Sequence, residues 1–301
     1  MRKILVIGAN GQVGWELLRT LAPLGTVIET SRDPAKTRLD LADPEQIRAT
    51  IQAVEPQIIV NAAAYTAVDR AEEEADQAMA INATAPGILA EEAKRRGALL
   101  IHYSTDYVYD GTKDVPYQEE DATNPQGVYG RSKLAGDEAI QAVGGNYLIF
   151  RTSWVYGGRG KNFLLTILRL IREGRNPLRI VGDQFGSPTW ARMIAETTAQ
   201  TLAGRDLGSL GELSGIYNLS STGETSWHGF AQQIAEWGQA LFDLPPVEVQ
   251  SIATHEYPTP ARRPAYSVLD GGKLATHFGV AMPDWQIALR LCLEDLAACP
   301  A

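Results

Sequence analysis

The sequence predicts an α/β protein built on a doubly wound parallel sheet, with a smaller α/β lobe in its C-terminal half. Short β-branched runs alternate with longer amphipathic segments, as a parallel sheet covered by helices requires. The first apolar run ends directly in a turn with three glycines, and the regular alternation weakens after about residue 155. With 301 residues, 45% of them hydrophobic, the chain can form one large domain or two coupled ones.

Five apolar runs in the first half are the expected strands of the sheet. They are almost continuously apolar, which is typical of parallel strands buried on both faces. These runs are residues 3–8, 26–30, 57–62, 98–104 and 146–151, and helical spacing is found in 11–25, 43–56 and 71–97. Asp43 before Pro44 is typical of a helix N-cap and first helical residue, and Asn124 before Pro125 repeats this signature ahead of Tyr129.

The second half predicts a smaller lobe that faces the substrate and is interleaved with the first half. The expected elements are helices at 163–174, 191–204 and 285–298 and strands at 178–182 and 215–221, with a proline-rich stretch at 245–264. We therefore predict a nucleotide-binding domain at 1–155. Residues 156–301 form mainly a substrate domain, some segments of which return to the first domain.

Composition excludes several classes of protein. The net charge is −9 and no basic cluster occurs, which argues against a nucleic acid partner. The two cysteines, Cys292 and Cys299, lie far from every motif, so that no metal centre or disulfide framework is expected. The opening apolar run, 4–9, is shorter than the core of a secretion signal, and no stretch approaches the roughly 20 residues of a membrane span. We therefore expect a cytoplasmic protein without a membrane partner.

The glycine turn predicts a dinucleotide site. Gly8, Gly11 and Gly14 follow the first strand and lead directly into a helix that begins near Gln12. Missing side chains allow a tight turn, a close approach of a pyrophosphate to the backbone, and close packing of helix on sheet. This pattern is typical of a Rossmann-type fold, although a glycine triplet alone also fits an ordinary strand-to-helix turn.

The end of the second strand favours NADP(H). An acidic residue there would bind the ribose hydroxyls of NAD, but Ser31 and Arg32 occupy the place where a 2′-phosphate would lie. Glu29, the nearest carboxylate, is expected inside the strand. NAD(H) stays open as an alternative, because Arg32 could equally be a solvent-exposed arginine.

A tyrosine and a lysine share one face of a predicted helix. Tyr129 and Lys133 are four residues apart, so that their side chains lie one turn from each other. A neighbouring ammonium lowers the pKa of a phenol, which is about 10 in a free tyrosine, toward the range useful in acid–base catalysis. Thr105, just beyond the fourth strand, is the candidate for holding a substrate oxygen, with Ser104 as support.

Together, the glycine turn, "STDY" at 104–107 and "YGRSK" at 129–133 closely resemble the extended short-chain dehydrogenase/reductase family. Within it, "GANGQVG", "NAAAYTAVDRAE", "RTSWVYG" and "DQFGSPTWA" are most similar to the dTDP-4-dehydrorhamnose reductases. The resemblance implies an NADP-dependent oxidoreductase that reduces the 4-keto group of dTDP-4-dehydro-L-rhamnose to dTDP-L-rhamnose, for polysaccharide biosynthesis. It also implies that Thr105 polarises the C4 oxygen, that Tyr129 donates the proton, and that Lys133 holds the nicotinamide ribose and lowers the pKa of Tyr129.

Further site residues follow from the same resemblance. The cofactor would be held by Tyr129, Lys133, Ser31 and Arg32, and by Gly8, Asn10, Gly11, Gln12, Val13, Gly14, Asp40, Leu41, Ala62, Ala63, Ala64 and Tyr65. The substrate would meet Thr105 and Tyr129, together with Val68, Asp69, Asp106, Tyr107 and Trp154. Trp154 would offer a flat apolar face to a sugar ring, or else pack in the cleft between the domains.

The residues that related dehydratases and epimerase-reductases use are not found at the corresponding positions of this sequence. A dehydratase typically carries an Asp-Glu pair after the threonine, but Tyr107 follows Asp106. Epimerase-reductases of the GDP-fucose type use a cysteine and a histidine in the pocket, whereas both cysteines lie near the C-terminus and His102 lies inside a strand. Another nucleotide-sugar epimerase or reductase and a non-catalytic NADP-binding regulatory subunit stay open as alternatives. The expected protein is a monomer or a homodimer; some relatives dimerise through Mg²⁺, for which this sequence offers no support.

Overall fold

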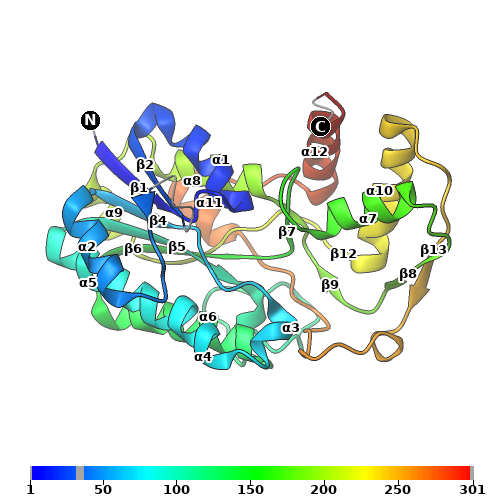
Figure 1. The fold of residues 1–301 in the computed structure, drawn as a ribbon, viewed down its shortest axis with the longest axis horizontal. Helices are drawn as coiled ribbons and strands as arrows, with labels where there is room; N and C mark the ends of the chain where they lie inside the picture. Colours follow the sequence, from blue (N-terminus) through cyan, green and yellow to red (C-terminus); the bar gives the residue numbers. More distant parts are fainter. Residues whose placement is uncertain (1, 32–36, 299–301) are drawn as a thin grey trace.

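A large parallel sheet forms the centre of the larger half of the molecule, and a smaller lobe lies beside it (Figure 1). The computed structural model describes residues 2–31 and 37–298. Seven strands are arranged in the order β11-β6-β5-β4-β1-β2-β3, and every pairing between neighbours is parallel. Their bounds are β1 Arg2–Ile7, β2 Gly25–Ser31, β3 Thr37–Arg38, β4 Ile58–Asn61, β5 Leu99–Thr105, β6 Asn146–Thr152 and β11 Gly215–Asn218. The predicted α/β fold with a parallel central sheet is confirmed.

Helices cover both faces of the sheet, because side chains along each strand alternate between two apolar cores. One core receives Ile4 and Val6 of β1 and packs against α1 Gln12–Thr20, α8 Ala191–Leu202, α9 Leu207–Glu212 and α11 Gly272–Phe278. The other receives Leu5 and Ile7 and packs against α2 Pro44–Val54, α5 Ala85–Arg96 and α6 Val128–Val143. The strands are thus buried on both faces, which explains their continuous apolar sequence.

The long helical segment predicted at 71–97 is divided into several elements. They are α3 Val68–Ala71, α4 Ala75–Met79, a π-helical turn at Ala80–Thr84, and α5, with a proline in its first turn. A proline lacks the N–H that a continuous helix needs, so the hydrogen-bond pattern changes before Pro86. The π turn places Asn82 against the loop after β4, where its side chain bonds both backbone groups of Tyr65.

One of the two predicted caps is confirmed. The Asp43 side chain accepts hydrogen bonds from the backbone N–H groups of Glu45 and Gln46 at the start of α2. The cap predicted at Asn124 is wrong, because α6 begins at Val128 after Gly127, which has no capping side chain. Asn124 instead donates from Nδ2 to the Asp110 carboxylate, at 3.2 Å. Its side chain therefore stabilises the preceding loop.

The second half of the chain contributes to both parts of the molecule. A third apolar core packs α7 Phe163–Arg172 against α10 Trp227–Phe242 and α12 Trp285–Ala298. Short strands join this lobe in three pairs: β7 Val155–Tyr156 with β10 Thr189–Trp190, β8 Leu178–Val181 with β13 Val249–Ile252, and β9 Phe185–Gly186 with β12 Thr225–Ser226. By contrast, β11, α8, α9 and α11 pack with the large sheet. We retain the division at residue 155 as a proposal about the two functional halves.

Among the described residues, the structure can be compared with the expectations about membrane spans, cysteines and metal sites. None of the described helices is long and apolar enough to cross a membrane. Cys292 is buried in the core of the lobe, with a free thiol. Within residues 2–31 and 37–298, no group of three or more histidine, cysteine or carboxylate side chains could hold a metal ion.

Candidate active site

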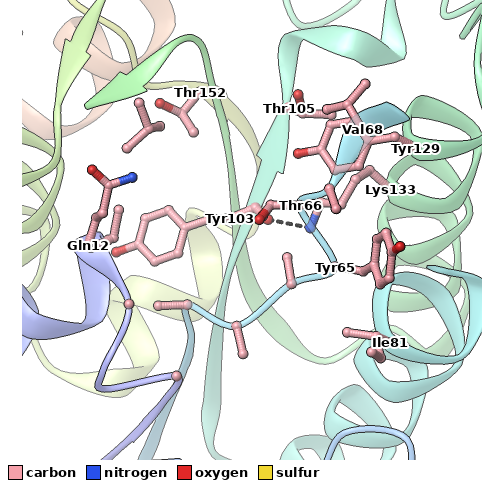
Figure 2. Close-up of a pocket in the computed structure, with 18 of the residues that line it drawn as sticks. Gln12, Tyr65, Thr66, Val68, Ile81, Tyr103, Thr105, Tyr129, Lys133 and Thr152 are labelled. Carbon is pink, nitrogen blue, oxygen red and sulfur yellow. Dashed lines mark hydrogen bonds between the residues drawn. The ribbon is translucent and has the colours of Figure 1, made fainter. Parts of the chain in front are cut away.

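A cavity of about 940 Å³ lies at the carboxyl edge of the sheet, where parallel α/β folds bind ligands. Its walls are the segments that follow β1, β4, β5 and β6, together with the first turns of α6. Lys161, Trp227 and Arg263 line it from the second half of the chain. Figure 2 shows Thr105, Tyr129 and Lys133 on one wall, with Gln12 and Thr152 on the opposite side.

The glycine turn leaves no room for side chains. Gly8 has a φ of 81°, and a Cβ there would lie 2.8 Å from the backbone nitrogen of Ala63. A Cβ on Gly14 would lie 2.1 Å from the carbonyl oxygen of Gly8, so this residue, buried in α1, lies beneath the turn and does not line the cavity. Gly8, Asn10, Gly11, Gln12 and Val13 do line it. The bare backbone and the helix N-terminus fit a pyrophosphate.

Most of the other residues predicted to hold the cofactor lie along the same cavity. Ser31, Asp40, Leu41 and the segment 62–65 all line it. Arg32 lies outside the described residues, whereas Glu29 lies within β2, as expected. The phenol of Tyr65 donates to Glu74 at 2.5 Å, and the carboxylate of Glu72 accepts from the Val128 N–H at 2.8 Å. Glu74 and Glu72 therefore hold the loop after β4 and the start of α6.

The structure brings the predicted triad together. Thr105 ends β5, while Tyr129 and Lys133 project from the first turns of α6 into the same wall of the cavity. Lys133 is fully buried, and its ammonium donates to the carbonyl oxygen of Tyr103 at 2.6 Å. Burial lowers the pKa of Lys133 to about 8, and the Asp137 carboxylate opposes this shift.

The pKa of Tyr129 shifts in the direction opposite to the predicted one. Burial raises this pKa well above its ordinary value of 10, and the adjacent Thr105 side chain only partly offsets the effect. The Lys133 ammonium contacts the carbonyl oxygen of Tyr103 and the ring of His102 on β5. The ring of Tyr107 packs edge-on against that of Tyr129, with 5.6 Å between their centroids, and adds to its apolar surroundings. At neutral pH Tyr129 is therefore a protonated phenol.

Asp106 is part of the hydrogen-bond system of Thr105. The Thr105 hydroxyl donates to Asp106 Oδ1 at 3.0 Å and accepts from the Tyr107 N–H at 3.2 Å. Ser153 donates to the other carboxylate oxygen, at 3.0 Å, and Ser267 also bonds to this carboxylate. Burial raises the pKa of Asp106 to about 6 despite these donors. The carboxylate lines the cavity and connects three segments of its wall.

The substrate residues predicted after β4 separate into two groups. Val68 lines the cavity, but Asp69 does not. Asp69 forms an ion pair with Arg263 at 3.0 Å and accepts from the Ala261 N–H at 3.3 Å. It therefore holds the proline-rich segment, whose Arg263 reaches the cavity in its place.

Trp154 lines the cavity with one ring face covered. Its indole stacks on that of Trp227, with centroids 3.5 Å apart and planes 4° from parallel. A Cβ on Gly186 would lie 2.5 Å from Trp154 Cε2, so the ring also fits closely against β9. Trp154 has a φ of 46°, which is uncommon for a bulky residue and typical of a site that the surroundings hold in place. Trp154 therefore packs closely inside the lobe while lining the cavity, and its contact with a sugar ring stays a prediction.

Several cavity residues were not predicted from the sequence. They include Thr66, Arg70, Tyr103, Lys161, Trp227 and Arg263. Trp227 follows Ser226, which caps α10 by accepting from the Gly229 N–H. This cap, with the helical spacing of 227–242, was a signal that could have located the helix. Nothing local indicates that Arg263 lies close to Tyr107, which is distant in the sequence.

Comparisons with known proteins agree with this arrangement. A family model described as the RmlD substrate binding domain matches residues 1–298. A dTDP-4-dehydrorhamnose reductase from Burkholderia thailandensis is 51% identical over 299 residues, covering 98% of this chain and 99% of that protein. The chain belongs to the dTDP-4-dehydrorhamnose reductase family.

Solved structures of dTDP-4-dehydrorhamnose reductases share the fold as well. The enzyme from Clostridium acetobutylicum superimposes with a TM-score of 0.88 at 34% identity, over 98% of this chain and 99% of that one. The enzyme from Bacillus anthracis, solved in complex with NADP, also has a TM-score of 0.88, at 32% identity and the same coverage of both chains. The NADP complex of this relative agrees with the cofactor predicted for the family member described here.

Proposed function

We propose that this protein reduces the 4-keto group of dTDP-4-dehydro-L-rhamnose with NADPH, giving dTDP-L-rhamnose. The observation that carries the proposal is the position of Thr105, Tyr129 and Lys133 on the wall of the cavity that the glycine turn also lines. The relative from Burkholderia thailandensis bears the name of this activity. Strict use of NADPH rather than NADH depends on Arg32 and stays a prediction.

The chain provides a cradle that fits the cofactor. A pyrophosphate needs a bare backbone at a helix N-terminus, and Gly8 and Gly11 supply it at the start of α1. Lys133 lines the cavity and is suited to hold the nicotinamide ribose. When bound, the reduced nicotinamide supplies a hydride to C4 of the sugar.

Tyr129 supplies the proton that completes the alcohol. Because burial raises its pKa, the phenol keeps its proton at neutral pH, as a donor in a reduction must. Loss of the proton leaves a buried phenolate, and the Lys133 cation on the same face of α6 stabilises that charge. Lys133 therefore acts after the proton has left, rather than by lowering the pKa of the resting phenol.

Thr105 has two possible hydrogen-bond arrangements in this reaction. While Asp106 is ionised, the single proton of Thr105 is directed to that carboxylate, so the hydroxyl oxygen can only accept from ligands. Protonation of Asp106 frees the Thr105 proton for the C4 oxygen. With the pKa of Asp106 at about 6, this protonation costs about 1.4 kcal/mol at pH 7.

The second half supplies groups suited to the nucleotide part of the substrate. Lys161 and Arg263 place two cations at the cavity, which favours a diphosphate. Trp154 and Trp227 add aromatic surface at the same place. We propose that Asp69 acts indirectly, by holding Arg263.

A direct assay tests the function. The purified protein is mixed with NADPH and dTDP-4-dehydro-L-rhamnose, and both the absorbance of reduced nicotinamide and the sugar product are followed. A reductase oxidises one NADPH for each dTDP-L-rhamnose formed. Sugar interconversion without NADPH oxidation would indicate an epimerase, and no conversion of either would indicate a binding subunit. Uridine and guanosine analogues of the substrate then define the preference for the base.

A further inference from the structure

A buried histidine lies directly behind Lys133 and has no part in the mechanism above. His102 occupies the middle of β5 and is 1% exposed. Its Nε2 lies 3.0 Å from Lys133 Nζ, and its Nδ1 lies 3.1 Å from the side-chain amide of Asn61 on β4. The imidazole therefore lies between Asn61 at the end of β4, which residues 62–65 of the cavity wall follow, and Lys133 of α6.

The contacts of Lys133 use two of the three protons of its ammonium. One points to the carbonyl oxygen of Tyr103 and one to Nε2 of His102. The third is left for the cavity, which Lys133 lines. Two fixed acceptors on one strand thus determine the direction in which a long and otherwise flexible side chain offers its remaining donor.

This arrangement requires one particular tautomer of His102. A charged lysine has no lone pair, so Nε2 must accept, and the single proton of the neutral ring must lie on Nδ1. As placed, the Asn61 amide nitrogen faces Nδ1, and the amide oxygen accepts from the Ala63 N–H at 3.3 Å. Both ring nitrogens would then meet donors, so the amide must be turned by half, which presents its oxygen to Nδ1–H and gives up the long bond from Ala63. Burial and the nearby Lys133 charge both lower the pKa of His102, which keeps the ring neutral.

The other charges around this pair favour a cationic lysine. Asp137 lies one turn along α6 from Lys133, and its carboxylate is buried with Arg151 of β6 at 3.4 Å. Ser104 of β5 donates to the same carboxylate at 2.9 Å. The charges that face the pair are therefore one carboxylate and one guanidinium, while Asn61 on β4 is neutral.

We propose that His102 is a positioning residue for Lys133: with its proton on Nδ1, the Nε2 lone pair holds the ammonium so that one N–H is directed into the cavity. The proposal rests on the proposed reductase function for its kinetic consequence. Its structural content, the tautomer of His102, does not depend on any activity.

The first test is a nitrogen-15 NMR spectrum of the cofactor-free protein with labelled histidine. The four histidines are distinguished by substitution, and the signals missing in His102→Gln are those of His102. We expect a neutral ring protonated at Nδ1. A ring protonated at Nε2, or at both nitrogens, at pH 7 would overturn the proposal even if the reductase activity were established.

The second test compares two variants in the reductase assay. His102→Leu removes the acceptor, so we expect kcat to fall about 10- to 100-fold, while KM for the sugar nucleotide changes little. The basic limb of the kcat–pH profile should move about one unit to lower pH, because the Lys133 charge loses a polar partner. His102→Gln carries an amide oxygen that can accept, and should restore the position of this limb.

Two controls separate positioning from a loss of structure. His255 is exposed on the lobe, and His255→Leu should leave kcat and the pH profile unchanged. Thermal unfolding of each variant reports damage to the core. If His102→Leu lowers kcat in proportion to the loss of folded protein, with a pH profile that superimposes on that of the parent, then the histidine is only a packing residue and the proposal is wrong.

Discussion

The hydroxyl of Thr105 donates its only proton to the carboxylate of Asp106, at 3.0 Å. In the proposed reaction Thr105 lies beside a ketone oxygen, which can only accept a hydrogen bond. The protonation state of a buried carboxylate therefore decides whether this threonine is a donor or an acceptor toward ligands. Asp106 is 2% exposed and bonded to hydroxyls from three segments of the chain.

Replacing Asp106 by asparagine should make stability less dependent on pH. Burial raises the folded-state pKa from 3.8 to about 6, so that Asp106 favours folding below pH 4 and loses this contribution as pH rises through 6. Two units correspond to about 3 kcal/mol. Asparagine lacks this titration, and denaturant unfolding of Asp106→Asn and the parent should show a stability difference that favours the variant more at pH 7.5 than at pH 4.5. A difference independent of pH would contradict the assigned shift.

Replacing Tyr129 by phenylalanine should remove the proton donor and keep the ring. We expect kcat to fall about 10²- to 10⁴-fold, the usual contribution of a positioned general acid. NADPH affinity, measured by fluorescence titration, should stay within about threefold, because Lys133 and the glycine turn are unaffected. The edge contact with Tyr107 also remains in the variant. Turnover equal to that of the parent would refute the role of this phenol.

The sequence predicts those features that depend on local chemistry or on a strict period. The apolar runs predict the strands of the sheet. Asp43 can be predicted as an N-cap because the proline that follows it is favoured in the first turn of a helix. Asn124 does not follow this rule. Its side chain donates a hydrogen bond to Asp110, and no local sequence pattern predicts that contact. The positions of Thr105, Tyr129 and Lys133 at the carboxyl edge follow from strand and helix order alone.

Long-range contacts explain what the sequence did not predict. The pKa of Tyr129 depends on how deeply the phenol is buried, and the surroundings of Tyr107, Asp106 and the lobe determine that. Arg263 meets Tyr107 and Asp69 only after the proline-rich segment returns to the sheet. Separations of 156 and 194 residues along the chain carry no periodic signal.

Arg32 lies outside the described residues, but its place in the sequence makes a prediction about the cofactor. Arg32→Ala should weaken NADPH binding by about tenfold and leave NADH binding nearly unchanged, because only NADPH carries the 2′-phosphate. Arg38 is a matched control, since it is exposed on β3 and does not line the cavity. Fluorescence titration with both nucleotides measures the effect. Equal losses for the two nucleotides would remove the basis for the predicted preference.

Trp227 should affect the sugar nucleotide through Trp154. The stack between the two indoles fixes one face of Trp154, whose backbone has the uncommon φ of 46°. Trp227→Leu removes the stack, which is worth about 1 kcal/mol beyond its buried area, and should raise KM for the sugar nucleotide about five- to tenfold. Phe163 packs on Trp227 without lining the cavity, so Phe163→Leu is the control and should change KM far less. Similar KM values in both variants would indicate that general packing of the lobe matters more than this stack.

Two glycines with positive φ allow two effects of an added side chain to be measured separately. One effect is backbone strain, and the other is a steric clash with neighbouring atoms. Gly97 ends α5 with a φ of 64° and open space around it, so Gly97→Ala should lower the free energy of unfolding by about 1–2 kcal/mol, from backbone strain alone. Gly8 has a φ of 81°, and its added Cβ would also press against the backbone of Ala63. Gly8→Ala should therefore destabilise the protein more and, unlike Gly97→Ala, weaken NADPH binding at least about tenfold, because the turn must move from the pyrophosphate. Denaturant unfolding and NADPH titration of both variants measure the two effects, and unchanged NADPH affinity in Gly8→Ala would mean that this turn does not contact the cofactor.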